Sequence, residues 1–447
     1  MPDSRQRYGR IVGCTIPERR DERTMTPANP LHKQRSSFQR RLRILARHPM
    51  MLSFYVPALM VAIANGLLSP ILPLFIKDLG GSYVGIGLVL AAPLLGTLIG
   101  DIPGGVLLRR WGHRQAMVLG LLLTVSMTFT CFWAKSIGMA FVLQLISGFG
   151  TALYAVARHT FVTDMVSIGS RGRAISAFGG MMRIGKFIGP MFGGTLGATY
   201  GLRLPFLVYG VIGGIAVVTV LLAAVTAPAI KHNVNPNPKH RISLLSVVRP
   251  RIKLLIPAGV GQLFAQMIRS GRTAIIPLYA ADVVGLDVGA IGWLLGIGAF
   301  VEMTLFYPAG WIMDHVGRKA AIVPSFLIQA VAMACVPLSS TFTTLLLCVM
   351  AIGAGNGLSS GAMMTLGSDL SPSKGRGEFL GVWRLIGDIG SSGGPNLVGT
   401  VADALALPSA AIVLAVAGLI SAAVFGFLLP ETLVKEKQVN LAVQTSP

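Results

Sequence analysis

Two ten-residue stretches of the chain share one pattern of glycines and cations. Residues 310–319 read GWIMDHVGRK, and residues 105–114 read GVLLRRWGHR. Each stretch has glycine at its first and eighth positions, basic residues after the second glycine, and apolar segments on both sides. A short basic loop that recurs between apolar segments indicates that one structural unit occurs twice in the chain.

Further matching residues extend this repeat over the whole apolar region. The matches keep a nearly constant spacing, which is 204 or 205 positions for the earlier sets and 201 for the last set. Several matches in order predict a duplicated half, and parallel repeats of six helices are a transporter architecture. The matching sets are Pro73-Leu74-Phe75 with Pro277-Leu278-Tyr279, Asp78 with Asp282, Gly148 and Gly150 with Gly353 and Gly355, Asp164 with Asp369, and Phe178, Gly180 and Arg183 with Phe379, Gly381 and Arg384.

The composition excludes an ordinary soluble domain. Of the 447 residues, 53% are hydrophobic and 12% are charged, whereas soluble domains carry about 25% charged residues. The apolar residues form blocks of roughly 20, which is the length of a membrane-spanning helix. Barrel strands would be shorter and would alternate in polarity, so we expect an all-α membrane protein with twelve spans. The expected spans are residues 52–76, 84–108, 116–134, 137–160, 174–198, 204–228, 254–280, 287–312, 320–338, 343–366, 377–401 and 406–429.

Basic residues gather in alternate connections between these spans. The other connections hold little beyond Lys77, Lys135 and Arg203. Because basic loops stay in the cytoplasm, we expect both termini there and the chain in the cell inner (plasma) membrane. The same placement accounts for the net charge of +21 without a nucleic-acid partner. The basic connections hold Arg109, Arg110 and Arg114, then Arg171 and Arg173, then six cations between Lys231 and Lys253, then Arg318 and Lys319, then Lys374 and Arg376.

The predicted organisation has five parts. A basic, disordered cytoplasmic tail (1–48) precedes a six-helix bundle (49–229), a basic cytoplasmic linker (230–252), a second six-helix bundle (253–430) and a cytoplasmic tail (431–447). The N-terminal tail lacks the apolar core of a secretory signal. The four cysteines show no metal-like spacing, so we expect no metal, cofactor or disulfide framework. They are Cys14, Cys131, Cys335 and Cys348.

The second loop copy closely resembles the signature of the major facilitator superfamily, G-x-x-x-D-R/H-x-G-R-R/K. The resemblance covers the whole chain in span count, half repeat and linker, and it implies two pseudo-symmetric six-helix bundles. It also implies that loop cations lock to acidic residues on neighbouring helices in the outward-facing state; plain topology anchoring is the alternative role. The first copy departs from the signature at Arg109, where the family has aspartate. The implied gating residues are Gly105, Arg109, Arg110, Gly112, Arg114 and Asp164, with Gly310, Asp314, Gly317, Arg318, Lys319 and Asp369.

The fifth expected span carries closely spaced glycines, since residues 185–194 read GKFIGPMFGG. The segment resembles the antiporter signature of the same superfamily, except that Ser176 stands at the signature's first glycine, and it implies export. The alternative is generic packing by small residues, with a kink at the proline. The fourth-span arginine of many proton-coupled members is replaced by Gln144. The antiporter-type residues are Gly185, Gly189, Pro190, Gly193 and Gly194.

Ionisable side chains inside apolar spans are costly and mark functional sites. Among the acids, Glu302 is the first candidate proton carrier, followed by Asp388 and Asp101. Arg158 and His159 are expected to extend to the cytoplasmic face. The excess of deep cations predicts an anionic or zwitterionic solute. The deep cations expected to line a cavity or to pair between helices are Arg183, Lys186, Arg269, Arg272 and Arg384, of which Arg384 could neutralise Asp388 one turn away.

These features predict a secondary active transporter that works as a monomer in the lipid bilayer. The first hypothesis is proton-coupled efflux of a small organic molecule or drug by alternating access. An importer of an organic anion on the same fold is the alternative. A receptor or membrane enzyme is a third class, but no complete phosphate-binding P-loop or zinc HExxH motif occurs, and no catalytic residue is expected.

Overall fold

The computed structural model describes residues 54–165, 168–226, 249–372 and 374–433, and nearly all of them lie in helices. The predicted N-terminal tail, most of the linker and most of the C-terminal tail therefore lie outside the described residues. The side chains of Arg109 and Asp164 also lie outside the description, although both positions belong to helices. The described residues contain no β-strand.

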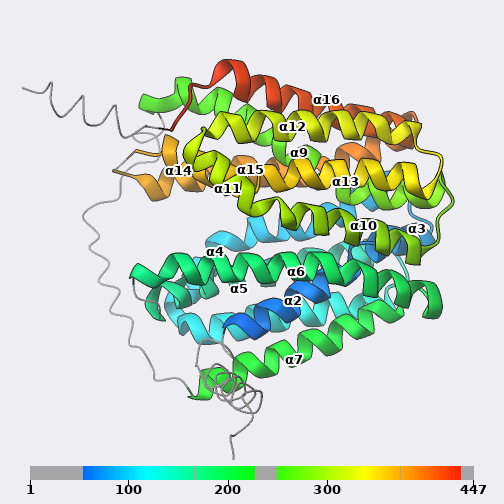
Figure 1. Ribbon diagram of the computed structural model, residues 1–447. Coiled ribbons are helices and arrows are strands. Elements are labelled where there is room, and N and C mark those ends of the chain that lie inside the picture. The colour runs from blue at the N-terminus through cyan, green and yellow to red at the C-terminus, as the bar shows by residue number, and fades with distance from the viewer. Residues whose placement is uncertain (1–53, 166–167, 227–248, 373, 434–447) are drawn as a thin grey trace, which may run out of the picture. The chain divides into compact units, whose positions relative to one another are not determined.

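The first half of the chain forms six labelled helices, which we call the N-half (Figure 1). Helix α4 passes through two expected spans without a connecting loop. At Gly112, a φ of 81° interrupts the helical backbone, so the two parts of α4 run as separate helices. The N-half consists of α2 (Val56–Leu68), α3 (Ile71–Asp78), α4 (Tyr83–Thr130), α5 (Ile137–Met165), α6 (Ile168–Tyr200) and α7 (Leu204–Thr226).

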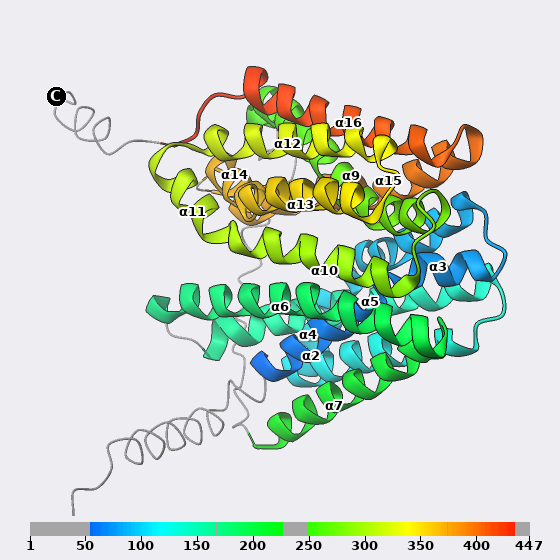
Figure 2. The same cartoon turned by 45° about the vertical axis from the view of Figure 1, so that its right-hand side comes forward.

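The second half, which we call the C-half, lies beside the N-half in both views (Figures 1 and 2). Its eighth and tenth expected spans are each divided into two shorter helices. The C-half consists of α9 (Ile252–Asp282), α10 (Val288–Thr304), α11 (Phe306–His315), α12 (Arg318–Cys335), α13 (Phe342–Leu358), α14 (Ala362–Leu370), α15 (Arg376–Ala404) and α16 (Leu407–Ala423), followed by a π-helical turn (Val424–Leu428).

Eight described helical segments are long and apolar enough to cross a membrane, and the pair α2 and α3, bent by 43°, would make a ninth. Helices α6, α9 and α15 are 33, 31 and 29 residues long, which exceeds the roughly 20 residues that a span requires. They are not among the eight apolar segments because they carry charged residues such as Lys186, Arg272 and Arg384. For these three helices, the twelve-span count stays a prediction.

Side chains at three helix starts explain where the helices begin. The Ser82 hydroxyl accepts a hydrogen bond from Gly85 N at 3.2 Å, at the start of α4. Asp287 accepts from Gly289 N at 2.9 Å at the start of α10, and Thr341 accepts from Thr344 N at 3.3 Å before α13. Each cap satisfies a backbone donor that the first helical turn leaves without a partner.

The two halves meet most closely through glycines near one end of the bundle. We call this the closed end; it holds the connections around residues 79–82 and 283–287. There, a Cβ on Gly87 would strike the Pro395 backbone. Likewise, α6 meets α10 where a Cβ on Gly194 would lie 2.7 Å from the Cα of Gly292. Helices associate in a bilayer through such close backbone approach, because lipid supplies no hydrophobic drive between them.

The opposite end, which holds Gly112 and Gly317, is called the loop-motif end. At this end, glycines of α4, α6 and α15, and one glycine of α11, which follows α10, have open space beside them. A Cβ added to any of them would have no other heavy atom within 4 Å, when the two chain neighbours and the adjacent backbone of the same helix are left out. The halves are therefore in tight contact at the closed end and further apart toward the loop-motif end. The glycines with open space are Gly105, Gly180, Gly310, Gly377 and Gly381.

Two glycines of α6 test whether close helix approach stabilises the fold. A Cβ on Gly189 would lie 2.6 Å from Gly66 Cα on α2, whereas a Cβ on Gly180 meets open space. We expect Gly189→Ala to lower the free energy of unfolding by about 1–3 kcal/mol, the usual cost of overpacking. Thermal unfolding of the purified protein in detergent measures the change. Gly180→Ala is the matched control, and equal melting temperatures for the two variants would contradict the packing role.

Candidate functional site

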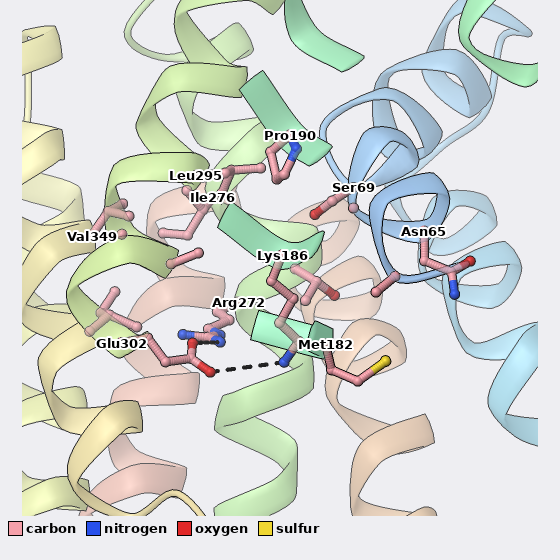
Figure 3. A pocket seen from close by; sticks show the side chains of 16 residues that line it. Asn65, Ser69, Met182, Lys186, Pro190, Arg272, Ile276, Leu295, Glu302 and Val349 are labelled. Carbon is pink, nitrogen blue, oxygen red and sulfur yellow. Dashed lines mark hydrogen bonds and ion pairs between the residues drawn. The ribbon is translucent and has the colours of Figure 1, made fainter. Parts of the chain in front are cut away.

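A polar cleft lies between the halves, in two cavities that share four lining residues. One cavity has a volume of about 250 Å³ and the other about 440 Å³. The smaller cavity is lined mainly by α2, α6, α9, α10 and α13, as the close-up shows (Figure 3). The larger volume lies in the range of pockets for small organic ligands, roughly 300–1,000 Å³. The four shared residues are Lys186, Arg272, Thr273 and Glu302.

Glu302 lies at the centre of this cleft between two cations. Its Oε2 is 2.8 Å from Nη2 of Arg272, and its Oε1 is 3.9 Å from Nζ of Lys186 (Figure 3). The Glu302 residue is only 6% exposed. A buried carboxylate is tolerable when it is paired in this way. Because Lys186 belongs to the N-half and the other two residues belong to the C-half, the cluster also links the halves.

Two further arginines beside the cleft have only neutral partners among the described residues. Arg269 donates to the carbonyl of Ser359 at 3.0 Å and to its hydroxyl, and its Nε is buried without a hydrogen-bond partner. Arg183 donates to the Ser360 hydroxyl at 2.6 Å, and its guanidinium lies 3.6 Å from the Phe306 ring centroid. Among the described residues, neither guanidinium forms an ion pair with a carboxylate.

The serines that hold these arginines were not foreseen from the sequence. Ser359 and Ser360 occupy the break between α13 and α14, which ends at Gly361 with a φ of 83°. The stretch GLSSG at 357–361 was the available signal, because small polar residues flanked by glycines interrupt an apolar helix. The break directs a hydroxyl or carbonyl toward each arginine.

A second charged cluster joins α4 of the N-half to α15 of the C-half. Arg384 Nη2 lies 3.2 Å from Oδ2 of Asp101, and Arg384 Nε lies 3.6 Å from Oδ2 of Asp388. The expected pairing within α15 is present, but the shorter contact crosses between the halves. One guanidinium thus faces two carboxylates, and Oδ1 of Asp101 is buried with no hydrogen-bond partner among the described residues. None of these three residues lines the two cavities.

The closed end is tied by polar contacts that sequence reasoning missed. Lys77 forms an ion pair with Asp282, whose other oxygen accepts from the Tyr83 hydroxyl at 2.8 Å. Asp403 accepts from the backbone N–H groups of Tyr83 and Val84, each at 2.9 Å. The carboxylate of Asp403 therefore lies at the N-terminus of α4, where a helix favours an anion. All these contacts join the N-half to the C-half.

The second copy of the loop signature is held within the C-half. Arg318 Nε lies 3.0 Å from Oδ2 of Asp369 on α14, and its Nη1 lies 3.6 Å from Asp314. Lys319 Nζ donates to the Gly426 carbonyl at 2.8 Å. Gly317 has a φ of 148°, which suits a residue without a Cβ. Arg318 of the loop signature thus contacts Asp369, which the resemblance implied as an acidic gating residue.

The C-terminal segment also binds this loop. Glu431 accepts from the backbone N–H groups of Arg318 at 2.9 Å and of Lys319 at 3.0 Å, at the start of α12. Burial alone would raise the pKa of Glu431, but hydrogen bonds from backbone N–H groups outweigh it and hold the pKa below its ordinary value.

In the first copy of the loop signature, Gly112 also has a positive φ. Arg110 of this copy is exposed, and Arg114 is half-buried.

The antiporter-type glycines serve helix packing on two sides of α6. Gly185, Gly189 and Gly193 face α2, and Gly194 faces α10. Pro190 lines the smaller cavity beside Lys186. The segment therefore combines close packing with exposure to the cleft.

The remaining deep cations lie on α5. Arg158 stacks on Phe178, 4.1 Å from the ring centroid, so aromatic rings cover a guanidinium that was expected to extend to the cytoplasmic face. His159 beside it is exposed. Among the described residues, no group of three His, Cys, Asp or Glu side chains is placed to hold a metal ion.

A family model matches the chain twice, once over each half. The model is that of the Major Facilitator Superfamily, and it matches residues 54–268 and 258–445. The chain belongs to the Major Facilitator Superfamily. Membership confirms the fold predicted from the sequence and identifies the protein as a multi-pass membrane transporter.

Relatives within the superfamily support this conclusion. An uncharacterized MFS-type transporter, MJ1560 of Methanocaldococcus jannaschii, is 23% identical over 360 residues, which cover 80% of this chain and 93% of that protein. The multidrug resistance protein MdtH of Escherichia coli is 27% identical over 318 residues, covering 70% of this chain and 76% of that protein.

Solved transporters share the fold at low sequence identity. A crystal structure of a POT family transporter with a thioalcohol-conjugated peptide superimposes with a TM-score of 0.71 at 14% identity, over 86% of this chain and 96% of that one. A bacterial homologue of the human lysosomal transporter Spinster, inward-facing and unoccupied, has a TM-score of 0.69 at 15% identity, over 84% and 95%.

The Glu431 contacts predict an acid-sensitive attachment of the C-terminal segment. Because the pKa of Glu431 is lowered on folding, its contribution is fully present above the ordinary value of about 4.3 and is lost as pH falls through the lower folded value. At neutral pH, we expect Glu431→Gln to speed hydrogen exchange of the Arg318 and Lys319 amides, measured by mass spectrometry. Glu378→Gln in the first turn of α15 is the control. Unchanged protection in Glu431→Gln would refute the attachment.

Proposed function

We propose that this transporter works by alternating access and exports a small organic molecule in exchange for protons. The observation that carries the proposal is the unequal contact between the halves along the bundle. Glycine contacts, one ion pair and hydrogen bonds join the halves at the closed end, whereas the described glycines named for the loop-motif end face open space. A polar cleft lies between the two regions. Such an arrangement suits a carrier whose halves rock about a central site.

The orientation follows from the basic connections. Cations gather at the loop-motif end, which we place in the cytoplasm together with both termini. The described state then opens inward and is closed outward. In the opposite state, the contacts of Lys77 with Asp282 and of Tyr83 with Asp403 would separate. The five predicted parts of the chain, with two bundles joined by the linker at 230–252, fit this movement.

Proton coupling is best assigned to the cluster of Asp101, Arg384 and Asp388. Two carboxylates share one guanidinium, so the cluster carries one uncompensated negative charge when both acids are ionised. Arg384 is 51% exposed in this state. Closing the loop-motif end would remove the charge from water, at a cost that binding one proton removes. The neighbouring charged or titratable groups on α5 are His159, within electrostatic reach of Arg384, and Arg158.

Glu302 is less suited to this role, although it was the first choice from the sequence. Arg272 and Lys186 both favour its ionised form, and a proton would leave two cations without their shared partner. We therefore assign Glu302 the role of a fixed counterion in the cleft. Export is favoured by the glycine-rich segment of α6 and by the multidrug resistance relative of Escherichia coli. An importer of an organic anion remains the second candidate, and the cation-rich cleft favours it.

Compound accumulation in cells tests the proposed function. The protein is expressed in an efflux-deficient bacterial strain, and the accumulation of a panel of fluorescent organic compounds is followed with and without a protonophore. We expect lower accumulation of at least one compound, and the protonophore should abolish the difference because export uses the proton gradient. Raised accumulation of an organic anion would instead support import. A difference that survives the protonophore would contradict proton coupling.

Replacing one acid of the second cluster separates coupling from binding. We expect Asp388→Asn to abolish transport driven by a pH gradient in proteoliposomes, because the cluster then lacks its extra negative charge. Exchange of labelled for unlabelled substrate, which needs no net proton movement, should persist near the wild-type rate. Glu378→Gln removes a carboxylate from the same helix outside the cluster and should leave both rates unchanged. Gradient-driven transport that survives Asp388→Asn would exclude this acid.

A further inference from the structure

Among the described residues that line the cleft, the cations outnumber the one carboxylate. Three cations and one acid line the two cavities, so two positive charges remain when all four groups are ionised. The cations belong to both halves: Lys186 comes from α6, and Arg269 and Arg272 come from α9. An uncompensated charge inside a membrane protein is costly unless a ligand or water balances it.

We propose that the cleft binds an amphipathic organic anion, with its acidic group among Lys186, Arg269 and Arg272 and its apolar body in the smaller cavity. This inference rests on the proposed transport function, since it names the substrate class of the same cleft. The anion would bridge the halves, because its cationic partners come from both.

The contacts show which cations are available to a ligand. Lys186 Nζ is 3.9 Å from Glu302, beyond hydrogen-bond distance, and its side chain is 57% exposed. Arg269 uses Nη2 for Ser359 and keeps its buried Nε without a partner among the described residues. Arg272, by contrast, is already paired at 2.8 Å. A ligand carboxylate can therefore bind Lys186 and Arg269 while Glu302 stays with Arg272.

The linings of the two cavities differ in the way an amphipathic ligand requires. Side chains of the larger cavity are mostly polar and surround the cations. Those of the smaller cavity are mostly apolar (Figure 3). Lys186, Arg272 and Glu302 line both cavities. A ligand can thus place its charge in one and its hydrocarbon in the other. The larger cavity includes Gln266, Ser270, Asn356, Ser360 and Ser391, and the smaller includes Ala62, Ile276, Leu295, Val349 and Ile352.

An organic cation fits the same cleft poorly. It would approach two uncompensated positive charges, and the one carboxylate available to it, Glu302, is buried and already paired. A neutral compound could fill the apolar cavity but would leave the cations unbalanced. The cleft therefore favours a ligand with negative charge over a neutral or cationic ligand of similar size.

Binding of size-matched probes to the purified wild-type protein tests this inference. Naphthalene-2-carboxylate, its neutral carboxamide and 2-naphthylmethylammonium are titrated by calorimetry in detergent, without any gradient. We expect the carboxylate to bind at least roughly tenfold more tightly than the amide, a difference of about 1.4 kcal/mol. Its affinity should fall as salt is raised, because the attraction is electrostatic. Equal affinities, a preference for the cation, or no binding of the carboxylate would overturn the proposal.

Variants of Arg269, with a matched control, test whether this residue causes the preference for the carboxylate over the amide. Arg269→Gln should bring the carboxylate-to-amide ratio close to one, and Arg269→Lys should retain most of it. Arg203→Gln is the control, because Arg203 also donates to a backbone carbonyl, that of Phe132 at 2.6 Å, and lies 5.4 Å from a phenylalanine ring centroid, but outside the cleft. An unchanged ratio in Arg269→Gln would refute this site.

The experiment separates two failures. Carboxylate binding without proton-driven transport would preserve the ligand class and reject the proposed function. Proton-driven transport of neutral compounds, together with equal binding of the carboxylate and the amide, would preserve the proposed function and reject the ligand class.

Discussion

A charge inside a bilayer is costly unless it is paired, and this constraint organises the centre of the molecule. Charged residues of helices α6, α9 and α15 meet Glu302 of α10 and Asp101 of α4, and these charges form two clusters. Each cluster contains residues from both halves. The halves therefore cannot move without changing the surroundings of the charges, and any change in charge feeds back on the position of the halves. Coupled transport requires this reciprocity.

The two clusters have opposite imbalances, and the distinction suggests a division of labour. Around Glu302 there are more cations than acids, whereas around Arg384 there are more acids than cations. In the proposed mechanism, the first cluster receives the organic solute and the second receives the proton. Because the sites share no residue, the protein need not force a solute and a proton to compete for one carboxylate. Communication between them would pass through the movement of the halves.

Much of the fold could be predicted because it leaves local signals in the sequence. Apolar length gave the spans, alternating basic loops gave the predicted orientation, and the repeated glycine pattern indicated the duplicated half. The pairing of Asp101 with Arg384 could not be predicted, since the two residues are far apart in sequence and only the crossing of α4 with α15 brings them together. The division of the eighth and tenth spans was also missed. Serines at 359 and 360 leave only a weak local signal, yet they hold two arginines.

The closed end has a kinetic consequence. Lys77, Tyr83, Asp282 and Asp403 join the halves through an ion pair and charge-assisted hydrogen bonds. Dissolved ions weaken such attractions, whereas they leave the glycine-to-backbone contacts deeper in the bundle unaffected. In the proposed mechanism, the dwell time of this state therefore depends on the ionic composition of the compartment that the closed end faces. In that mechanism, the turnover of the transporter would depend on the salinity of its surroundings as well as on the solute it carries.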